Sequence, residues 1–324
     1  MKKILVTGAG GFIGGHLVKE LINRGYQVRA TDIKPFDEWY QCFDKVENLE
    51  LDMAIKENCY KATEGMGDVI NMACNMGGMG FIENNKALCM LSVLVNTHML
   101  MACKEHKIKR YFFSSSACAY NTDLQKDPKI TGLKESDAYP AMPEDGYGWE
   151  KLFGERMCRH FFEDYGLDVK VARYHNIYGP NGTYDGGREK APAALCRKVI
   201  SSILNNEEKI DVWGDGNQTR SFLYIDDCVE ATLKLFDSKH HGPINIGSEE
   251  QVSINEMIEK IEKISNKSVQ KNYQLDKPRG VMGRNSDNTL IRSQLEWEPK
   301  FTLYQGIEKT YEWIFSEMRK KHNQ

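Results

Sequence analysis

The 324-residue chain lacks a large excess of charge and any obvious cross-linking pattern. Its 43 basic residues nearly balance its 46 acidic ones, so no strongly basic surface for nucleic acid or an anionic membrane is indicated. The nine cysteines form no Cys-x-x-Cys pair, which argues against a structural zinc site and a disulfide scaffold. We therefore expect a cytoplasmic protein without a bound metal, whose partners are small molecules.

Long apolar runs are also missing from the sequence. The N-terminal apolar stretch is interrupted at Gly8 and is too short for a signal peptide, and no run reaches the roughly 18 residues of a membrane span. With 41% apolar residues, the chain is still long enough for a full core and more than one lobe. These features exclude membrane-spanning and nucleic-acid-binding classes and favour a globular enzyme or binding protein.

Strand-like and helix-like patterns alternate in the N-terminal half and predict an α/β fold. We expect a Rossmann-type, doubly wound parallel sheet with helices on both faces, followed by a smaller C-terminal substrate-binding lobe. The expected strands are 4–6, 28–32, 68–72, 110–114 and 169–173, and the first helix is 16–23. The expected domains are a nucleotide-binding domain of 1–180 and 224–249 and a substrate lobe of 181–223 and 250–324.

The stretch 87–103 is apolar on nearly every side. A helix without a polar face must be covered all round, either by the sheet and a second subunit or by the sheet and more of the same chain. We expect the second subunit, and therefore a homodimer.

Three glycines follow the first strand at the spacing Gly8-x-x-Gly11-x-x-Gly14. Gly8 permits a tight turn, Gly11 lets the backbone approach a pyrophosphate, and Gly14 lets the helix pack closely on the strand. Phe12 and Ile13 lie at the helix N-terminus, which receives the phosphate charge. Glycines alone could form a merely flexible turn, but a preceding strand and an acid ending the second strand predict a dinucleotide site.

Acidic residues near this site bear on the identity of the cofactor. Asp32 ends the second strand, where a carboxylate accepts hydrogen bonds from ribose hydroxyls and repels a 2′-phosphate, so we expect NAD rather than NADP. The cations Arg29 and Lys34 nearby weaken that preference. Asp52 is either a contact to adenine or a solvated acid at a strand end.

Tyr147 and Lys151 are four residues apart at the start of a helical pattern, so they share one face of that helix. A cation beside a phenol favours the phenolate, which lowers the tyrosine pKa and makes it a usable acid or base. Ser116, at the end of the preceding strand, can hydrogen-bond the same substrate oxygen. An isolated Tyr-x-x-x-Lys is usually a surface pair, but here it follows the strand, the glycine turn and the serine in the order that hydride transfer requires.

These residues resemble the extended short-chain dehydrogenase/reductase family, also called the NAD-dependent epimerase/dehydratase family, which acts on nucleotide sugars. The resemblance covers essentially the whole chain. It implies that Tyr147 is the base for oxidation at C4 of the sugar, that Lys151 lowers its pKa and binds the nicotinamide ribose, and that Ser116 positions the hydroxyl.

Cys118 and Lys190 are a second proton-transfer pair, which simple oxidation would not need. Once C4 is a ketone, the hydrogens on C3 and C5 become removable, and inverting either carbon needs a base on one face and an acid on the other. Cys118 lies just beyond Ser116 on the same strand end, and a nearby cation can lower its thiol pKa so that it serves as the base. Lys190 would be the acid, although a lone cysteine is usually a buried hydrophobe and a loop lysine is usually solvated.

Longer motifs resemble family members that epimerise GDP-sugars at C3 and C5, at 71–82, 115–118, 175–180, 186–194, 213–222 and 283–288. The resemblance places the base on Cys118 and the acid on Lys190. It implies that Gly77 and Gly78 let the chain approach the hexose. It further implies that the sugar and its diphosphate are held by Asn176, Glu189, Lys190, Lys198, Gln218, Arg220 and Arg284.

Other functions stay open at this point. A 4-epimerase often has Thr at position 118 and a 4,6-dehydratase usually has Asp-Glu at 117–118, where this chain has Ala-Cys, so both are disfavoured. An epimerase of another GDP-sugar, such as a heptose, and an NAD-binding regulator without activity are further alternatives. A hydrolase using Ser116 and His175 is disfavoured because no G-x-S-x-G surrounds the serine.

Overall fold

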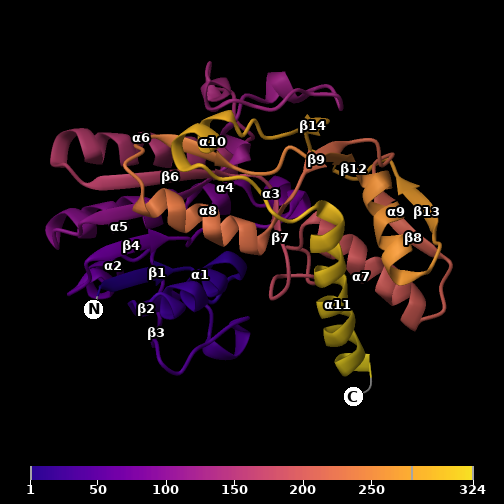
Figure 1. The fold of residues 1–324 in the computed structure, drawn as a ribbon, viewed down its shortest axis with the longest axis horizontal. Helices are drawn as coiled ribbons and strands as arrows, with labels where there is room; N and C mark the ends of the chain where they lie inside the picture. The colour runs from indigo at the N-terminus through magenta and orange to yellow at the C-terminus, as the bar shows by residue number, and fades with distance from the viewer. Residues whose placement is uncertain (1, 279, 323–324) are drawn as a thin grey trace.

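The computed structural model describes residues 2–278 and 280–322 and is built around a seven-stranded sheet (Figure 1). All seven strands are parallel, in the order β11-β6-β5-β4-β1-β2-β3. Their bounds are β1 Lys3–Thr7, β2 Gln27–Asp32, β3 Glu47–Glu50, β4 Asp68–Asn71, β5 Arg110–Ser116, β6 Asp168–Tyr174 and β11 Pro243–Ile246. The predicted doubly wound α/β fold is confirmed.

Alternate side chains of β1 enter two separate cores. Ile4 and Val6 pack on one face of the sheet, and Leu5 packs on the other. The first face is covered by α1 Phe12–Asn23 and α8 Ile225–Asp237, and the second by α2 Lys56–Thr63, α5 Val93–Glu105 and α6 Tyr147–Tyr165. A strand buried on both faces is apolar throughout, which explains the short continuous apolar runs in the sequence.

The apolar stretch at 87–103 forms two helices rather than one. α4 (Lys86–Met90) and α5 (Val93–Glu105) are separated by a short turn, and a small helix, α3 (Met79–Asn84), precedes them. The segment Lys86–Glu105 is by composition apolar enough to cross a membrane. In the structure, 44% of its most apolar 18-residue stretch is buried. The prediction that no such run exists was therefore wrong on composition, although a buried core helix has the same composition.

A second, smaller group of elements lies at the other end of the molecule, where α11 packs on α7 and α9 (Figure 1). Its helices are α7 Ala191–Leu204, α9 Ile254–Ser265 and α11 Leu303–His322. Its strands are β8 Lys209–Trp213 with β13 Gln270–Gln274, and β9 Thr219–Ser221 between β12 Gln251–Ser253 and β14 Gly283–Arg284. The exact domain boundaries given above stay a prediction.

Short elements connect the two groups. The parallel strands β7 (Ile177–Tyr178) and β10 (Leu223–Tyr224) form a two-stranded sheet, and α10 (Thr289–Leu295) follows β14. Four 3-10 helices lie in the loops, η1 Phe36–Glu38, η2 Ala117–Ala119, η3 Thr122–Gln125 and η4 Glu135–Ala138.

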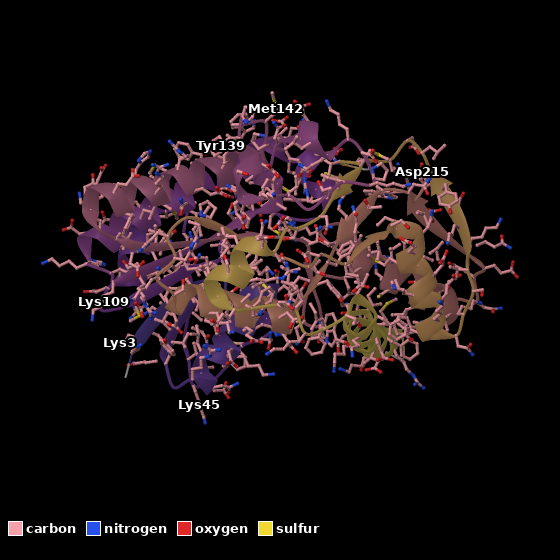
Figure 2. The ribbon with its side chains drawn as sticks, turned by 45° about the horizontal axis from the view of Figure 1, so that its top comes forward. Lys3, Lys45, Lys109, Tyr139, Met142 and Asp215 are labelled. Atoms are coloured by element: carbon pink, nitrogen blue, oxygen red, sulfur yellow. The ribbon has the colours of Figure 1, made fainter. Side chains whose placement is uncertain are left out.

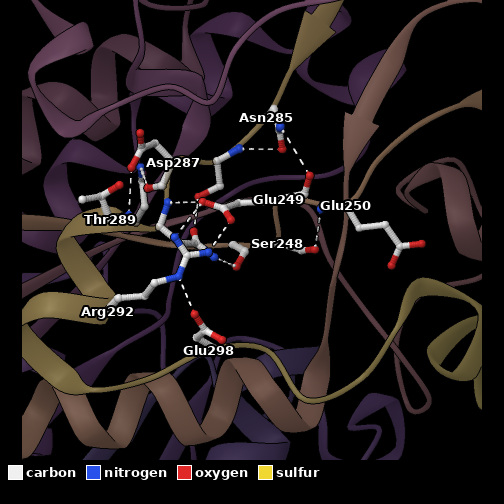
Figure 3. Close-up of polar contacts among 12 residues, drawn as sticks. Ser248, Glu249, Glu250, Asn285, Asp287, Thr289, Arg292 and Glu298 are labelled. Atoms are coloured by element: carbon white, nitrogen blue, oxygen red, sulfur yellow. Dashed lines mark hydrogen bonds and ion pairs between the residues drawn. The ribbon is translucent and has the colours of Figure 1, made fainter.

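A polar network fixes α10 beside the end of β11 (Figure 3). Arg292 of α10 pairs with Glu249, and its Nε donates to Glu298 at 2.6 Å. Glu249 also accepts from the backbone N–H of Asn288 at 3.0 Å, and Asp287 accepts from the N–H of Thr289 at 2.8 Å. The polar run 285–289 is thus held by local hydrogen bonds, and these bonds fix the end of the strand that carries Arg284.

Charged side chains are spread over the outer surface rather than gathered on one face. Lys3, Lys45 and Lys109 project from the sheet-containing end of the molecule, and Asp215 lies at the other end (Figure 2). This mixture agrees with the near-balance of charge in the sequence.

Candidate active site

A cavity of about 640 Å³ follows the carboxyl ends of β1, β2, β4 and β5. In open α/β sheets this edge is where ligands bind. Many of the predicted residues line the cavity, namely Gly8, Gly11, Phe12, Ile13, Gly14, Asp32, Asp52, Ser116, Tyr147 and Lys190.

The glycine turn between β1 and α1 has the geometry of a phosphate cradle. Gly8 has a φ of +67°, and a Cβ there would lie 2.8 Å from the carbonyl carbon of Met72. A Cβ on Gly14 would lie 2.1 Å from the Gly8 carbonyl oxygen, so α1 can pack this closely only with glycine. Side chains at Gly8 and Gly14 would meet the chain's own backbone, so glycine is needed to bring the α1 N-terminus close to the end of β1 at the cavity, and the residues present fit NAD.

Asp32 is buried at the end of β2 and lines the cavity, where Oδ1 accepts from the Lys34 N–H at 3.1 Å. Arg29 does not oppose it, because its Nε donates to Glu47 at 2.8 Å and its Nη1 donates to backbone carbonyls. Asp52 also lines the cavity and accepts from the Ala54 N–H at 2.8 Å. Of the two cations that weakened the preference for NAD, Arg29 is therefore engaged elsewhere, whereas Lys34 lines the cavity.

Tyr147 is the first residue of α6, and its phenol faces the cavity. Lys151 is fully buried beneath it, with Nζ 5.4 Å from the centre of the tyrosine ring. The same Nζ lies 3.4 Å from Glu150 Oε2, so a buried carboxylate offsets part of the lysine charge.

This arrangement changes the expected protonation of the tyrosine. Burial raises the pKa of Tyr147 well above its usual value, and Cys74, Cys118 and Glu150 raise it further, whereas the hydrogen bond with Ser116 lowers it. Burial acts to lower the pKa of Lys151, but Cys74 and Glu150 outweigh it and the pKa is raised. The net direction for the phenol is upward because burial is the largest influence, and the expected role of Lys151 toward Tyr147 stays a prediction.

Cys118 and Lys190 come from two segments of the chain that are far apart in the sequence. Cys118 lies in η2, directly after β5, and its N–H donates to Ser116 Oγ at 3.2 Å. Its side chain packs in one apolar cluster with Tyr147. Lys190 caps α7 and lines the same cavity as Tyr147 and Ser116. The thiol and the ammonium are close enough for the charge of Cys118 to act on the pKa of Lys190.

Arg284 joins the thiol to a carboxylate that the sequence analysis did not single out. The buried guanidinium has Nη1 3.5 Å from Cys118 Sγ and Nη2 2.8 Å from Glu144 Oε1. Its Nε donates to Gln125 Oε1 at 2.7 Å. All three guanidinium nitrogens therefore have partners in the chain, and Arg284 lies against the proposed base.

The pKa values of the second pair shift in opposite directions. Burial and then Glu144 raise the pKa of the Cys118 thiol to about 11, and Arg284 only partly offsets them. Burial lowers the pKa of Lys190, and Arg284 lowers it further. The expected cation is present beside the thiol and acts to lower its pKa, but burial and the Glu144 charge outweigh it; the role of Cys118 as a base stays a prediction.

The predicted glycines of the substrate site pack against the loop that carries Lys190. The Gly78 N–H donates to the Arg188 carbonyl at 3.0 Å, and a Cβ on Gly78 would lie 2.4 Å from the Glu189 carbonyl oxygen. A Cβ on Gly77 would instead meet the Phe81 side chain. Glu189 pairs with Arg197, at 3.1 Å from Nη2 to Oε1.

The remaining predicted substrate residues are not all brought together, because Lys198 of α7 contacts β8 within the smaller group of elements. Asn176 Nδ2 donates to the Ser221 carbonyl at 3.0 Å, and Lys198 Nζ donates to the Asp211 carbonyl at 2.6 Å. Gln218 is buried, and its Oε1 has no hydrogen-bond partner within the described residues.

Arg220 lies opposite Arg284 on the neighbouring strand, so two guanidinium groups are adjacent in register. Burial and then Arg284 lower the pKa of Arg220 to about 10, while Arg220 Nη2 donates to the Val281 carbonyl at 2.6 Å. The predicted roles of these residues toward a sugar diphosphate stay predictions.

His175 is a structural residue, as expected. It is fully buried, its Nε2 lies 2.9 Å from Asn245 Oδ1, and burial lowers its pKa to about 3. Within the part of the chain that the structure describes, no cluster of three or more His, Cys, Asp or Glu is placed to hold a metal ion.

Residues 4–247 match the family model described as the NAD dependent epimerase/dehydratase family. A GDP-mannose 3,5-epimerase of Arabidopsis thaliana is 44% identical over 320 residues, which are 98% of this chain and 84% of that enzyme.

Solved structures have the same fold. A UDP-glucose 4-epimerase of Thermotoga maritima, solved with UDP-glucose, superposes with a TM-score of 0.88 at 24% identity, covering 98% of this chain and 99% of that one. A UDP-glucuronic acid 4-epimerase of Bacillus cereus, solved with UDP-glucuronic acid and NAD, has a TM-score of 0.83 at 26% identity, covering 98% and 99%.

Proposed function

This chain belongs to the NAD-dependent epimerase/dehydratase family, and we propose that it converts GDP-mannose to GDP-L-galactose, with GDP-L-gulose formed when only C5 inverts. The assignment as an NAD-dependent sugar epimerase rests on the family match and on 44% identity to a GDP-mannose 3,5-epimerase over nearly the whole chain. The choice of sugar and the chemistry below are the proposal.

The first step is oxidation at C4 of the hexose. Tyr147, as the phenolate, takes the proton of the C4 hydroxyl while Ser116 holds the same oxygen, and Lys151 stabilises the phenolate from below. The glycine turn and Asp32 would hold NAD, which would supply the hydride acceptor for C4 and the hydride donor for the final reduction, so no net oxidation would occur. Burial, Cys74, Cys118 and Glu150 raise the pKa of Tyr147 and the hydrogen bond with Ser116 lowers it, so the phenolate is the minor form in the resting protein.

The second step is inversion next to the new ketone. The C4 carbonyl delocalises the carbanion formed at C5 or C3, so a thiolate at Cys118 can remove the proton from one face. Lys190 then delivers a proton to the opposite face. After both inversions, the phenol of Tyr147 returns its proton to the C4 oxygen as the ketone is reduced.

One observation carries this proposal. Cys118 packs in one apolar cluster with Tyr147, and Lys190 lines the cofactor cavity with Tyr147 and Ser116, so a thiol and an amine from two different segments of the chain lie close enough for the charge of one to act on the other. A simple dehydrogenase or a 4-epimerase needs neither group. The alternatives of a 4,6-dehydratase, a 4-epimerase or an epimerase of another GDP-sugar share the fold and the cofactor and differ in the fate of the ring hydrogens.

The test is incubation of the purified protein with GDP-mannose in deuterated water, followed by NMR of the recovered sugar nucleotides. We expect deuterium at both C3 and C5. Deuterium at C5 and C6 with loss of water would indicate a dehydratase, and a protein that labels no nucleotide sugar would be a regulator. The variants Cys118→Ala and Lys190→Met should lose on the order of a hundredfold or more of the exchange while still binding NAD.

We also propose that the chain acts as a homodimer through α5 and α6. α5 and α6 pack side by side, and apolar side chains remain exposed on α6 and on α4, which precedes α5, namely Trp149 at 42%, Phe153 at 49% and Met90 at 42%. Large apolar side chains grouped on neighbouring elements are typical of protein interfaces.

A further inference from the structure

We propose that Glu144 is a positioning residue that keeps Cys118 in its thiol form, by holding the Arg284 guanidinium that would otherwise stabilise the thiolate. This inference rests on the proposed function only for its catalytic consequence, because the protonation of the thiol can be measured without any sugar substrate.

The geometry gives Glu144 and Cys118 one shared cation. Arg284 reaches the carboxylate at 2.8 Å and the sulfur at 3.5 Å, so the oxygen has the closer, charge-assisted contact. The Glu144 backbone is fixed to the same place, because its N–H donates to the Cys118 carbonyl at 3.0 Å. The second carboxylate oxygen, Oε2, is buried without a hydrogen bond of its own in the described residues.

The charges around Glu144 determine whether its carboxylate is ionised and how it acts on the Cys118 thiol. Arg284 and Arg220 act on Glu144 from the neighbouring strands β14 and β9, and Arg284 is the stronger influence that lowers the carboxylate pKa against its burial. Glu83 of α3 faces Glu144 from the other side, and its own pKa is raised, first by burial and then by Glu144. Glu144 therefore stays ionised at neutral pH, and its negative charge opposes a thiolate beside it.

Glu144 also lines a second cavity, of about 720 Å³, on the side of the cluster away from the glycine turn. The neighbouring Asp145 lines the same cavity but pairs with Lys86 at 2.8 Å and is exposed. These two adjacent carboxylates therefore provide a matched pair for an experiment, since only Glu144 contacts the guanidinium that reaches the sulfur.

The experiment measures alkylation of Cys118 by iodoacetamide as a function of pH, in the NAD-loaded protein, with the modified peptide quantified by mass spectrometry. In Glu144→Gln the guanidinium is released to the sulfur and the negative charge is gone, so the thiol pKa falls. We expect the midpoint of alkylation to fall by at least about one pH unit, which raises the rate near neutral pH about tenfold. Asp145→Asn should behave like the wild type, and Glu144→Asp should stay close to it.

An unchanged midpoint in Glu144→Gln would overturn the inference. A lowered midpoint supports it, and deuterium exchange at C5 then tests the proposed function separately. If the alkylation midpoint falls but the pH dependence of exchange does not follow, Glu144 controls the thiol while Cys118 is not the base.

A second measurement serves if Glu144→Gln does not fold. The ultraviolet absorbance of the thiolate, taken as the difference between the wild type and Cys118→Ala across pH, gives the titration of this one sulfur. The same titration is also taken in Glu144→Ala. A midpoint that is lower in this variant than in the wild type supports the inference, and a wild-type midpoint at or below the ordinary value of about 8.5 overturns it.

Discussion

Two carboxylates, Glu150 and Glu144, each lie beside a cation that the chemistry uses. Glu150 is 3.4 Å from the ammonium of Lys151, and Glu144 is 2.8 Å from the guanidinium of Arg284. In both cases the cation is ion-paired in the resting protein, so its full charge is not available to the neighbouring phenol or thiol. The reactive forms of Tyr147 and Cys118 are therefore minor forms at neutral pH.

The raised pKa of Cys118 predicts the pH dependence of inversion. Only the deprotonated sulfur can act as a base, and its pKa of about 11 lies above neutral pH. Exchange of deuterium into C5 should therefore rise with pH, by up to about tenfold per unit below that pKa. NMR of the exchange rate at a series of pH values checks this, with Cys118→Ala as the blank, and a flat profile from pH 7 upward would contradict it.

Asp32 predicts the choice between NAD and NADP. Its carboxylate lies at the end of β2 in the cofactor cavity, where it would bind ribose hydroxyls and repel a 2′-phosphate. Asp32→Ser should weaken NAD binding by about 1–3 kcal/mol and narrow the preference over NADP, as measured by titration of the cofactor-stripped protein. Asp52→Asn, in the same cavity, should leave the preference unchanged, and equal loss of preference in both variants would contradict the assignment.

At the scale of elements, the sequence predicted those features that depend on residues close together in the chain. The β1 turn and α1 follow from the strand, the glycine spacing and the helical pattern, although α1 begins at Phe12 rather than at the predicted residue 16 because its first turn is rich in glycine. The cluster of Gln125, Glu144 and Arg284 could not be predicted in this way. These residues are far apart in the sequence and meet because β14 pairs with β9. The spacing of residues in the sequence gives no indication of this contact.

The packing of α1 against its turn gives a test at this scale. Gly14→Ala puts a Cβ 2.1 Å from the Gly8 carbonyl oxygen, so α1 must move away from β1. We expect a loss of about 1–3 kcal/mol in the free energy of unfolding and a large loss of NAD affinity, measured by urea denaturation and by cofactor titration.

The adjacent Gly15→Ala is the matched control. Its Cβ would meet mainly the flexible side chain of Gln41, at 3.1 Å, and alanine favours the helix by about 1 kcal/mol over glycine. This variant should keep its stability and its NAD affinity. Equal losses in the two variants would show that the close contact at Gly14 is not the cause.

At the scale of the whole molecule, the exposed apolar side chains of α4 and α6 predict the oligomeric state. Phe153→Glu puts a charge on that surface, and we expect the dimer to dissociate to a monomer of 37.1 kDa in light scattering after size-exclusion chromatography. Leu275→Glu, at an exposed apolar residue in the other part of the molecule, should remain dimeric. A wild-type protein that is already monomeric would contradict the proposal.

Arg220 and Arg284 are register partners on the adjacent strands β9 and β14. The folded chain therefore holds two positive charges side by side in a buried place, where each disfavours the other. Repulsion of this kind is tolerated at a cost in stability, and an anion that binds between the strands removes it. GDP should therefore raise the melting temperature more than guanosine does, because only GDP carries the phosphates. The melting temperature of the protein would then report how well a ligand's charge fits this place. Candidate sugar nucleotides could be ranked by their effect on the melting temperature before any catalytic assay is available.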